Sequence, residues 1–206
     1  ATFLHPFDDE YVIAGQGTIG LEILEQLNGN VDTILCPIGG GGIIAGIAVA
    51  AKGINPNIKI VGVQTANIPS MHESMKNGKV TTAFNATTIA DGIAVKTPGN
   101  VTFDIIKDLV DEVVVVEEDE IAQGMLFLME NQKVVAEGSG AVSTAALLSK
   151  KYVPQKDENV VCIISGGNVD VNTLYRVIGT ALTKEARRYA FNTVIQDKPG
   201  GLAELT

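Results

Sequence analysis

Apolar residues follow two spacings along this chain, and the two spacings alternate. Short β-branched runs such as 33–38 and 58–63 are typical of buried strands, whereas Ile19, Ile23 and Leu27 recur at helical spacing. This alternation predicts the α/β fold class, with a mostly parallel, twisted sheet and helices on both faces. The predicted strands are 11–13, 33–38, 58–63, 111–116 and 159–164, and the predicted helices are 18–27, 43–52, 70–76, 101–109, one that follows 117–120 and ends near 130, and 140–149.

Three glycine-rich segments, 15–20, 39–42 and 165–168, each come directly after a predicted strand. They are therefore predicted to be turns at the carboxyl edge of the sheet, where parallel α/β folds bind their ligands. Free backbone N–H groups at the start of a helix favour a phosphate, and a helix is predicted to begin at Ile43. The pattern predicts that the chain binds a phosphorylated cofactor.

The first glycine segment has the spacing of the dinucleotide-binding fingerprint, with glycine at 15, 17 and 20. That motif also needs an acidic residue at the end of the next strand, and Asp32 lies at the wrong end. NAD binding and a turn used only for packing remain open as two interpretations of this segment.

The second segment, 39–42, is the more specific one. Four consecutive glycines are costly unless the backbone must approach another group closely. A Walker loop would continue with lysine and a hydroxyl residue, and Ile43 and Ile44 supply neither, which excludes an ATPase site of that type. A tight turn without a ligand is the remaining alternative.

Composition and charge narrow the possible partners. The net charge of -9, with only 15 lysines and arginines in 206 residues, argues against nucleic acid and against an anionic membrane surface. No apolar run approaches the roughly 20 residues that would span a bilayer. Cys36 and Cys162 both lie in apolar runs, which predicts buried, reduced thiols and a cytoplasmic location.

Six motifs in a fixed order carry a resemblance to a known family. The set resembles the threonine ammonia-lyases (threonine dehydratases), which are fold-type II, tryptophan-synthase-β-like enzymes dependent on pyridoxal 5'-phosphate (PLP). The likeness extends to about residue 186. It implies a large PLP-binding domain over 1–186 without its N-terminal part and small domain, and a linker with the truncated start of an ACT-like regulatory domain over 187–206. The motifs are HPFDD at 5–9, AGQGTIG at 14–20, PIGGGG at 37–42, TIADG at 88–92, AEGSG at 136–140 and SGGN at 165–168.

The resemblance implies a site and a reaction. The backbone of the glycine loop would bind the cofactor phosphate, and Ser165 would hydrogen-bond the pyridine nitrogen. Glu137 would face the ring as the candidate catalytic residue of this chain, although a solvated acid at a helix start is the other interpretation of Glu137. The reaction would be loss of water from L-threonine to give 2-oxobutanoate and ammonia, and L-serine would give pyruvate. The cofactor-binding residues implied are Gly39, Gly40, Gly41, Gly42, Ile43, Ser165 and Gly166.

One departure concerns the Schiff-base lysine of the family, which lies in a Ser-x-Lys-x-Arg segment. None of the lysines in this chain has that context, and Lys96 is the nearest approach. We therefore expect the chain to hold the cofactor but to be inactive by itself.

No metal site is predicted. Relatives with a divalent-cation site carry a glutamate where this chain has Gln64, and a neutral amide replaces a carboxylate poorly. His5 and His72 are isolated in the sequence, Asp91-Gly92 is interpreted as a turn, and the acids at 117–120 as partners of a helix dipole.

Three hypotheses of function remain open. In the first hypothesis, the chain is part of a threonine ammonia-lyase that acts on a small amino acid and forms a homo-oligomer in its full-length form. Alternatively, it is a noncatalytic or complementing module that binds phosphate ligands, or it is an NAD-binding oxidoreductase domain.

Overall fold

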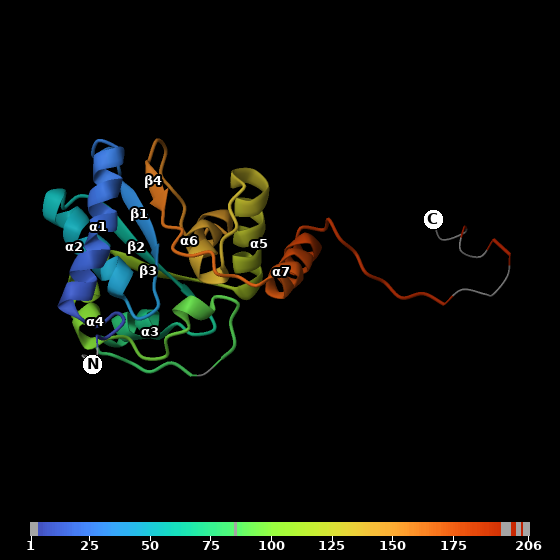
Figure 1. Cartoon of the computed structure of the whole chain (residues 1–206), viewed down its shortest axis with the longest axis horizontal. Coiled ribbons are helices and arrows are strands. Elements are labelled where there is room, and N and C mark those ends of the chain that lie inside the picture. The colour runs from blue at the N-terminus through green and yellow to red at the C-terminus, as the bar shows by residue number, and fades with distance from the viewer. Residues whose placement is uncertain (1–3, 85, 195–198, 201–202, 204–206) are drawn as a thin grey trace.

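The computed structural model describes residues 4–84, 86–194, 199–200 and 203. In this part of the chain a parallel sheet has the strand order β3-β2-β1-β4. Helices flank it on both sides (Figure 1), which confirms the predicted α/β class. The strands are β1 (Thr33–Pro37), β2 (Lys59–Thr65), β3 (Glu112–Val116) and β4 (Val160–Cys162), and the helices are α1 (Glu10–Gln26), α2 (Gly42–Ile54), α3 (Ser70–Asn77), α4 (Asn100–Leu109), α5 (Glu118–Phe127), α6 (Gly138–Leu148) and α7 (Val171–Lys184), with a 3-10 turn η1 (Asp91–Ile93) and a π turn η2 (Leu128–Gln132).

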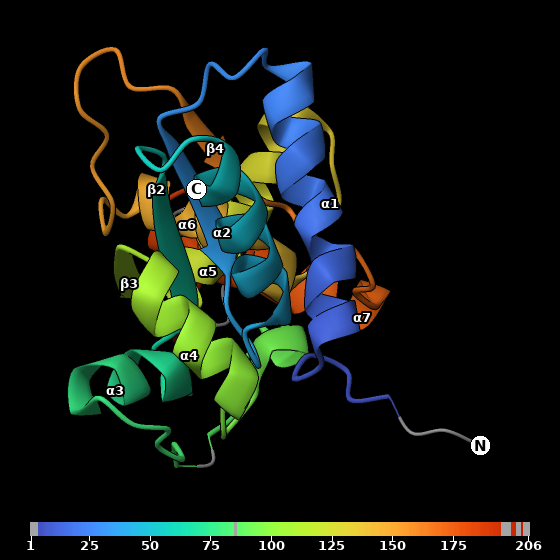
Figure 2. The ribbon, with the colours of Figure 1, turned by 90° about the vertical axis from the view of Figure 1, so that its left-hand side faces the viewer.

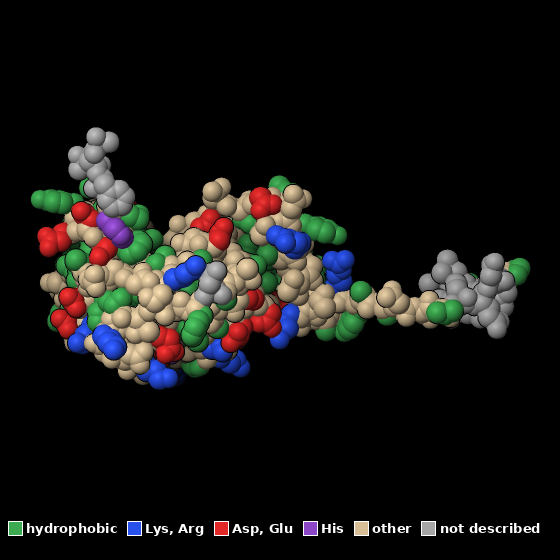
Figure 3. Space-filling model, turned by 90° about the horizontal axis from the view of Figure 1, so that it is seen from below, with side chains coloured by type: hydrophobic (Ala, Val, Ile, Leu, Met, Phe, Trp, Pro, Cys, Tyr) green, Lys and Arg blue, Asp and Glu red, His purple; other side chains and the backbone are tan. Residues whose placement is uncertain are grey.

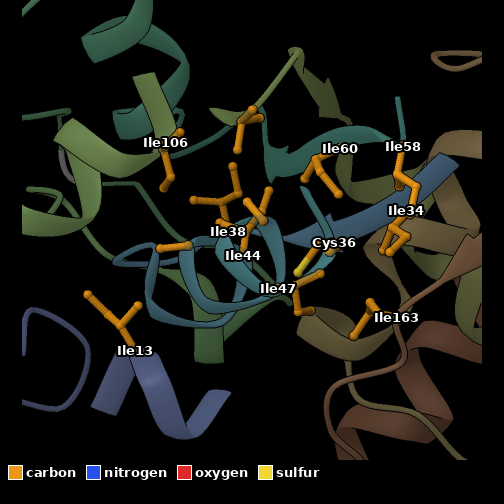
Figure 4. Packing of buried hydrophobic residues seen from close by; sticks show 14 of the residues in the cluster. Ile13, Ile34, Cys36, Ile38, Ile44, Ile47, Ile58, Ile60, Ile106 and Ile163 are labelled. Atoms are coloured by element: carbon orange, nitrogen blue, oxygen red, sulfur yellow. The ribbon is translucent and has the colours of Figure 1, made fainter. Parts of the chain in front are cut away.

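The sheet separates two apolar clusters because successive residues of a strand point to opposite faces. Ile34 and Cys36 of β1 pack with α1, α2 and α4 on one face (Figure 4), whereas Leu35 of β1 packs with α5 and α6 on the other. Figure 2 shows α2 and α4 in front of the sheet and α5 and α6 behind it. The buried β-branched runs thus form a central sheet covered on both sides.

The N-terminal part of the fold differs from the prediction. The strand at 11–13 and the turn at 15–20 are wrong, because both segments belong to helix α1, whose N-terminus is capped by the Asp9 carboxylate. Gly17 and Gly20 face α2, and a Cβ on Gly20 would lie 3.2 Å from the carbonyl oxygen of Ile47. A fingerprint needs its glycines in a strand-to-helix turn. Here Gly17 and Gly20 lie in the middle of a helix, where they allow α1 and α2 to approach closely. The structure therefore supports the packing interpretation and does not support NAD binding.

The C-terminal part differs as well. Helix α7 was not predicted, although Asp170 caps it and Val177 and Ala181 bury one of its faces against α5. The strand predicted over 187–195 is not formed over the described residues 187–194, and 195 lies outside them. A strand needs a hydrogen-bonded neighbour, and here the segment runs away from the body (Figure 1) with Phe191 76% exposed. The predicted helix start in 197–206 falls mostly outside the described residues.

Charged side chains of both signs are interspersed on the face shown in Figure 3. Several acidic side chains of the molecule are paired with lysines or arginines, as in the ion pair of Asp119 with Lys184 (2.5 Å). Within the described residues no helix combines the length and the apolar character that a membrane span requires.

The two cysteines are free thiols on neighbouring strands. Cys36 belongs to the core on one face of the sheet, and Cys162 packs against the core of the other face, so the sheet itself separates the sulfurs. Burial raises the pKa of Cys162 to about 11 and raises that of Cys36 still further.

We expect slow alkylation of Cys162 in the folded chain. The thiolate is the reactive form, and raising the pKa from 9.0 to about 11 lowers the thiolate fraction at pH 8 roughly 90-fold. Iodoacetamide labelling followed by mass spectrometry, with the urea-unfolded chain as control, measures the ratio of the two rates. Equal rates in the two states would contradict this placement of Cys162.

Candidate functional site

A cavity of about 350 Å³ lies at the carboxyl ends of the strands. This volume falls within the range of roughly 300–1,000 Å³ that is usual for small-molecule sites. The cavity is formed by the loop after β1, the segment after β4, the start of α6, η1 and the N-terminal segment. Its lining includes Phe7, Gly39 to Ile43, Gly92, Glu137, Ser139 and Ser165.

The glycine loop supplies the main group of hydrogen-bond donors. Gly41 has φ +103°, in the left-handed region that only glycine adopts readily, and its conformation turns the chain from β1 into α2. In the part of the chain that the structure describes, the backbone N–H groups of residues 39–43 donate no hydrogen bond. Buried backbone donors are nearly always paired, so unpaired ones at a helix start are suited to bind an anion, and the helix dipole there also favours negative charge.

Protein groups enclose the loop on its other sides. A Cβ on Gly40 would overlap the ring of Phe7, and one on Gly41 would lie 2.7 Å from Cδ1 of Ile106. The carbonyl oxygen of Gly40 accepts a hydrogen bond from the hydroxyl of Thr102 in α4 (2.6 Å). Glycine is therefore required here by close packing as well as by φ.

Asp8 fixes the N-terminal segment against α4. Its carboxylate accepts hydrogen bonds from the N–H groups of Asn100 (3.0 Å) and Thr102 (3.1 Å). Its own N–H donates to Nδ1 of His5 (2.9 Å), whose ring meets that of Phe7 edge to face. The HPFDD motif thus holds Phe7 over the glycine loop.

Glu137 and Ser165 lie on a second wall of the cavity. The Glu137 carboxylate accepts from the N–H of Asn168 (3.0 Å), and the Glu137 N–H donates to the carbonyl oxygen of Gly166 (3.1 Å). A Cβ on Gly166 would overlap Glu137 Oε1, so glycine is needed there for the carboxylate to fit. All the predicted site residues except Gly166 therefore line one cavity, and Gly166 contacts Glu137 instead.

Eight residues of the lining are not among the predicted site residues: Pro6, Phe7, Gln16, Pro37, Gly92, Ile93, Val95 and Ser139. Asp91-Gly92 forms the predicted turn, as η1, and in addition a Cβ on Gly92 would lie 2.8 Å from Ser139 Oγ and 3.2 Å from Glu137 Oε1. The TIADG and AEGSG motifs could have indicated Gly92 and Ser139, because each motif has a glycine next to a polar side chain in the sequence. Only the fold brings the two motifs together.

The acidic segment at 117–120 has the predicted structural role. Glu117 and Glu120 form a capping box at the start of α5. Glu118 accepts from the N–H of Ile89 (2.8 Å) and from the hydroxyl of Thr65 (3.0 Å), which holds the segment that leads to Gly92.

Gln64 is fully buried and uses both ends of its amide. Its Nε2 donates to the carbonyl oxygen of Ile38 (3.2 Å) and its Oε1 accepts from the N–H of His72 (2.9 Å). Over residues 4–84, 86–194, 199–200 and 203 no group of three or more His, Cys, Asp or Glu side chains is arranged to hold a metal ion.

Comparison with known proteins agrees with this geometry. The profile of the family described as pyridoxal-phosphate dependent enzyme matches residues 1–166. The L-threonine ammonia-lyase of Thermotoga maritima is 52% identical over 205 residues, which covers 100% of this chain and 50% of that protein. The catabolic L-threonine dehydratase TdcB of Escherichia coli strain K12 is 51% identical over 180 residues, covering 86% of this chain and 54% of the relative.

Solved structures show the same fold. The processed form of threonine deaminase isoform 2 from Solanum lycopersicum superposes with a TM-score of 0.81 at 39% identity, over 87% of this chain and 52% of that one. Maize serine racemase superposes with a TM-score of 0.80 at 39% identity, over 90% and 57% of the two chains. The chain spans about half the length of the curated relatives it matches. With a family profile matched over residues 1–166 and relatives above 50% identity, the chain belongs to the pyridoxal-phosphate dependent enzyme family.

Proposed function

We propose that this chain is the cofactor-binding part of a threonine ammonia-lyase. Such an enzyme converts L-threonine to 2-oxobutanoate and ammonia, and L-serine to pyruvate. The observation that carries the proposal is the row of backbone N–H groups at the start of α2 that have no partner among the described residues and belong to residues lining a cavity of suitable size. The names of the relatives from Thermotoga maritima and Escherichia coli support the choice of substrate.

In this proposal the N–H groups of Gly39, Gly40, Gly41, Gly42 and Ile43 bind the cofactor phosphate. The donor set fits a phosphate because its groups are neutral, belong to residues that line one cavity and lie at the positive end of a helix dipole. Phe7 closes one side of the loop and excludes water from it.

Ser165 and Glu137 are proposed to lie beside the pyridine ring of the bound cofactor. When bound, PLP supplies the electron sink that makes the α-proton of an amino acid acidic. The Ser165 hydroxyl is a neutral donor, so it cannot hold a ring nitrogen protonated as an aspartate would, and this favours elimination over a long-lived carbanion. Glu137 is held in place by the N–H of Asn168 and contacts Gly166, which keeps its carboxylate at the edge of the cavity.

The Schiff-base lysine is proposed to come from another segment of the enzyme. Among the described residues that line the cavity there is no lysine. We also propose the division into a PLP-binding domain over 1–186 and an ACT-like start over 187–206, and a homo-oligomeric, cytoplasmic full-length enzyme.

Cofactor binding and turnover test the proposal separately. We expect the chain to bind PLP in competition with inorganic phosphate, measured by isothermal titration calorimetry. Borohydride reduction should label no single lysine preferentially, and the chain alone should form no 2-oxobutanoate from L-threonine. Product should form once a lysine-bearing segment of the family is supplied.

The manner of that rescue separates two of the hypotheses. Activity only after covalent joining indicates a piece of one enzyme, whereas activity on mixing two separate chains indicates a complementing module. One dominant labelled lysine together with product would overturn the proposal that the catalytic lysine lies elsewhere. Failure to bind PLP would overturn the cofactor site itself.

A further inference from the structure

One hydroxyl in the wall of the cavity has no partner. Ser139 is 2% exposed, and its Oγ makes no hydrogen bond within the described residues. Most buried side-chain polar atoms have at least one partner, so such an atom calls for an explanation. Ser143, one turn further along α6, has the only other buried, unpaired side-chain oxygen or nitrogen in the part of the chain that the structure describes.

The surroundings of Ser139 distinguish it from Ser143. Ser139 lies in the first turn of α6 and lines the cavity, whereas Ser143 does not line it. Gly92 lies against Ser139, and a Cβ at that position would come within 2.8 Å of Oγ. The chain thus uses a glycine to leave room beside this hydroxyl.

We infer that Ser139 Oγ hydrogen-bonds a polar atom on the ring of the bound cofactor, separate from its phosphate. The inference rests on the proposed cofactor site. The phosphate already has the N–H groups of residues 39–43, while Ser139 adjoins Glu137 on the wall assigned to the ring. A hydroxyl both donates and accepts, so it can pair with a ring oxygen or a ring nitrogen. Ser139 is accordingly a cofactor-contacting residue that becomes satisfied only on binding.

Ser139→Ala in the full chain tests this inference, with Ser143→Ala as the matched control. We expect Ser139→Ala to raise the Kd for PLP about tenfold, the effect of losing one good hydrogen bond. It should leave the Kd for inorganic phosphate unchanged, and Ser143→Ala should change neither constant. Calorimetric titration with each of the two ligands gives these values.

The stability of the ligand-free variants gives a second readout. Removing an unpaired buried hydroxyl should not lower Tm, whereas removing a hydroxyl with a structural role should. An unchanged Kd for PLP in Ser139→Ala would overturn the inference while leaving the proposed function intact. A lowered Tm together with equal losses of affinity for PLP and phosphate would have the same meaning. A parent chain that binds phosphate but not PLP, or neither, would overturn both.

Discussion

Replacing Gly41 by alanine is expected to lower the affinity for PLP about 100-fold, because it disturbs charge-assisted hydrogen bonds that are worth roughly 1.5–3 kcal/mol each. Gly41 has φ +103°, which an alanine adopts only with strain, and the new Cβ would lie 2.7 Å from Ile106 Cδ1 and 2.9 Å from Thr102 Cβ. The loop must therefore move, which displaces its N–H groups from their places beside the cavity. We also expect a loss of about 2–4 kcal/mol in the free energy of unfolding, from strain and overpacking together.

Gly53→Ala is the matched control because Gly53 lies in α2, the helix that begins directly after Gly41. A Cβ on Gly53 meets nothing within 4 Å, so alanine should increase stability by about 0.5–1 kcal/mol through its helix propensity. PLP titration and urea denaturation of both variants give the comparison. Normal PLP affinity in a folded Gly41→Ala chain would rule out the glycine loop as the phosphate site.

Gly46→Ala is expected to destabilise the fold more than any exposed substitution, by about 3 kcal/mol or more. Gly46 is buried where α2 crosses α1. A Cβ there would overlap the carbonyl oxygen of Ile13 and would lie 2.6 Å from the backbone nitrogen of Gly17. Both are backbone atoms, so the helices can relieve the overlap only by moving apart. The midpoint and slope of urea denaturation measure the loss.

Gly15→Ala in α1 separates this packing effect from helix propensity. Gly15 is exposed and has nothing within 4 Å of its Cβ position, so alanine should stabilise the helix by about 1 kcal/mol. Opposite effects at Gly15 and Gly46 would show that the glycines of this region serve helix contact. Equal losses at both positions would contradict the crossing geometry.

The sheet could be predicted from sequence because its signal is local. β1 and β2 are buried β-branched runs, and in β1 the glycine loop follows directly, so periodicity and composition identify strand, turn and helix together. The resemblance, which depends on short motifs, predicts the glycine loop, Glu137 and Ser165 of the cavity lining, whereas eight other lining residues, Ser139 among them, are not predicted. Both successes rest on residues close to one another in sequence.

The errors of prediction arise where the role of a residue depends on a contact with a residue far away in the sequence. The glycines of α1 resemble a phosphate-binding turn by spacing, but the contacts of Gly17 and Gly20 with α2 show that these two serve helix packing. Ser139 and Gly92 are adjacent only because η1 and α6 meet at the cavity. Helix α7 has an amphipathic face whose burial depends on α5, and that contact cannot be deduced from the local sequence.

The cap that Asp8 supplies to α4 has a consequence for the order of folding. Gly99 provides no side-chain cap, so the helix receives its N-terminal acceptor from a residue 92 positions earlier in the chain. Closing so long a loop costs conformational entropy before the contact is gained, and contacts of this kind form late. Because Thr102 of the same helix holds the carbonyl oxygen of Gly40, a partly folded chain has no finished glycine loop. We therefore expect the phosphate site to bind its ligand only in chains that have completed folding.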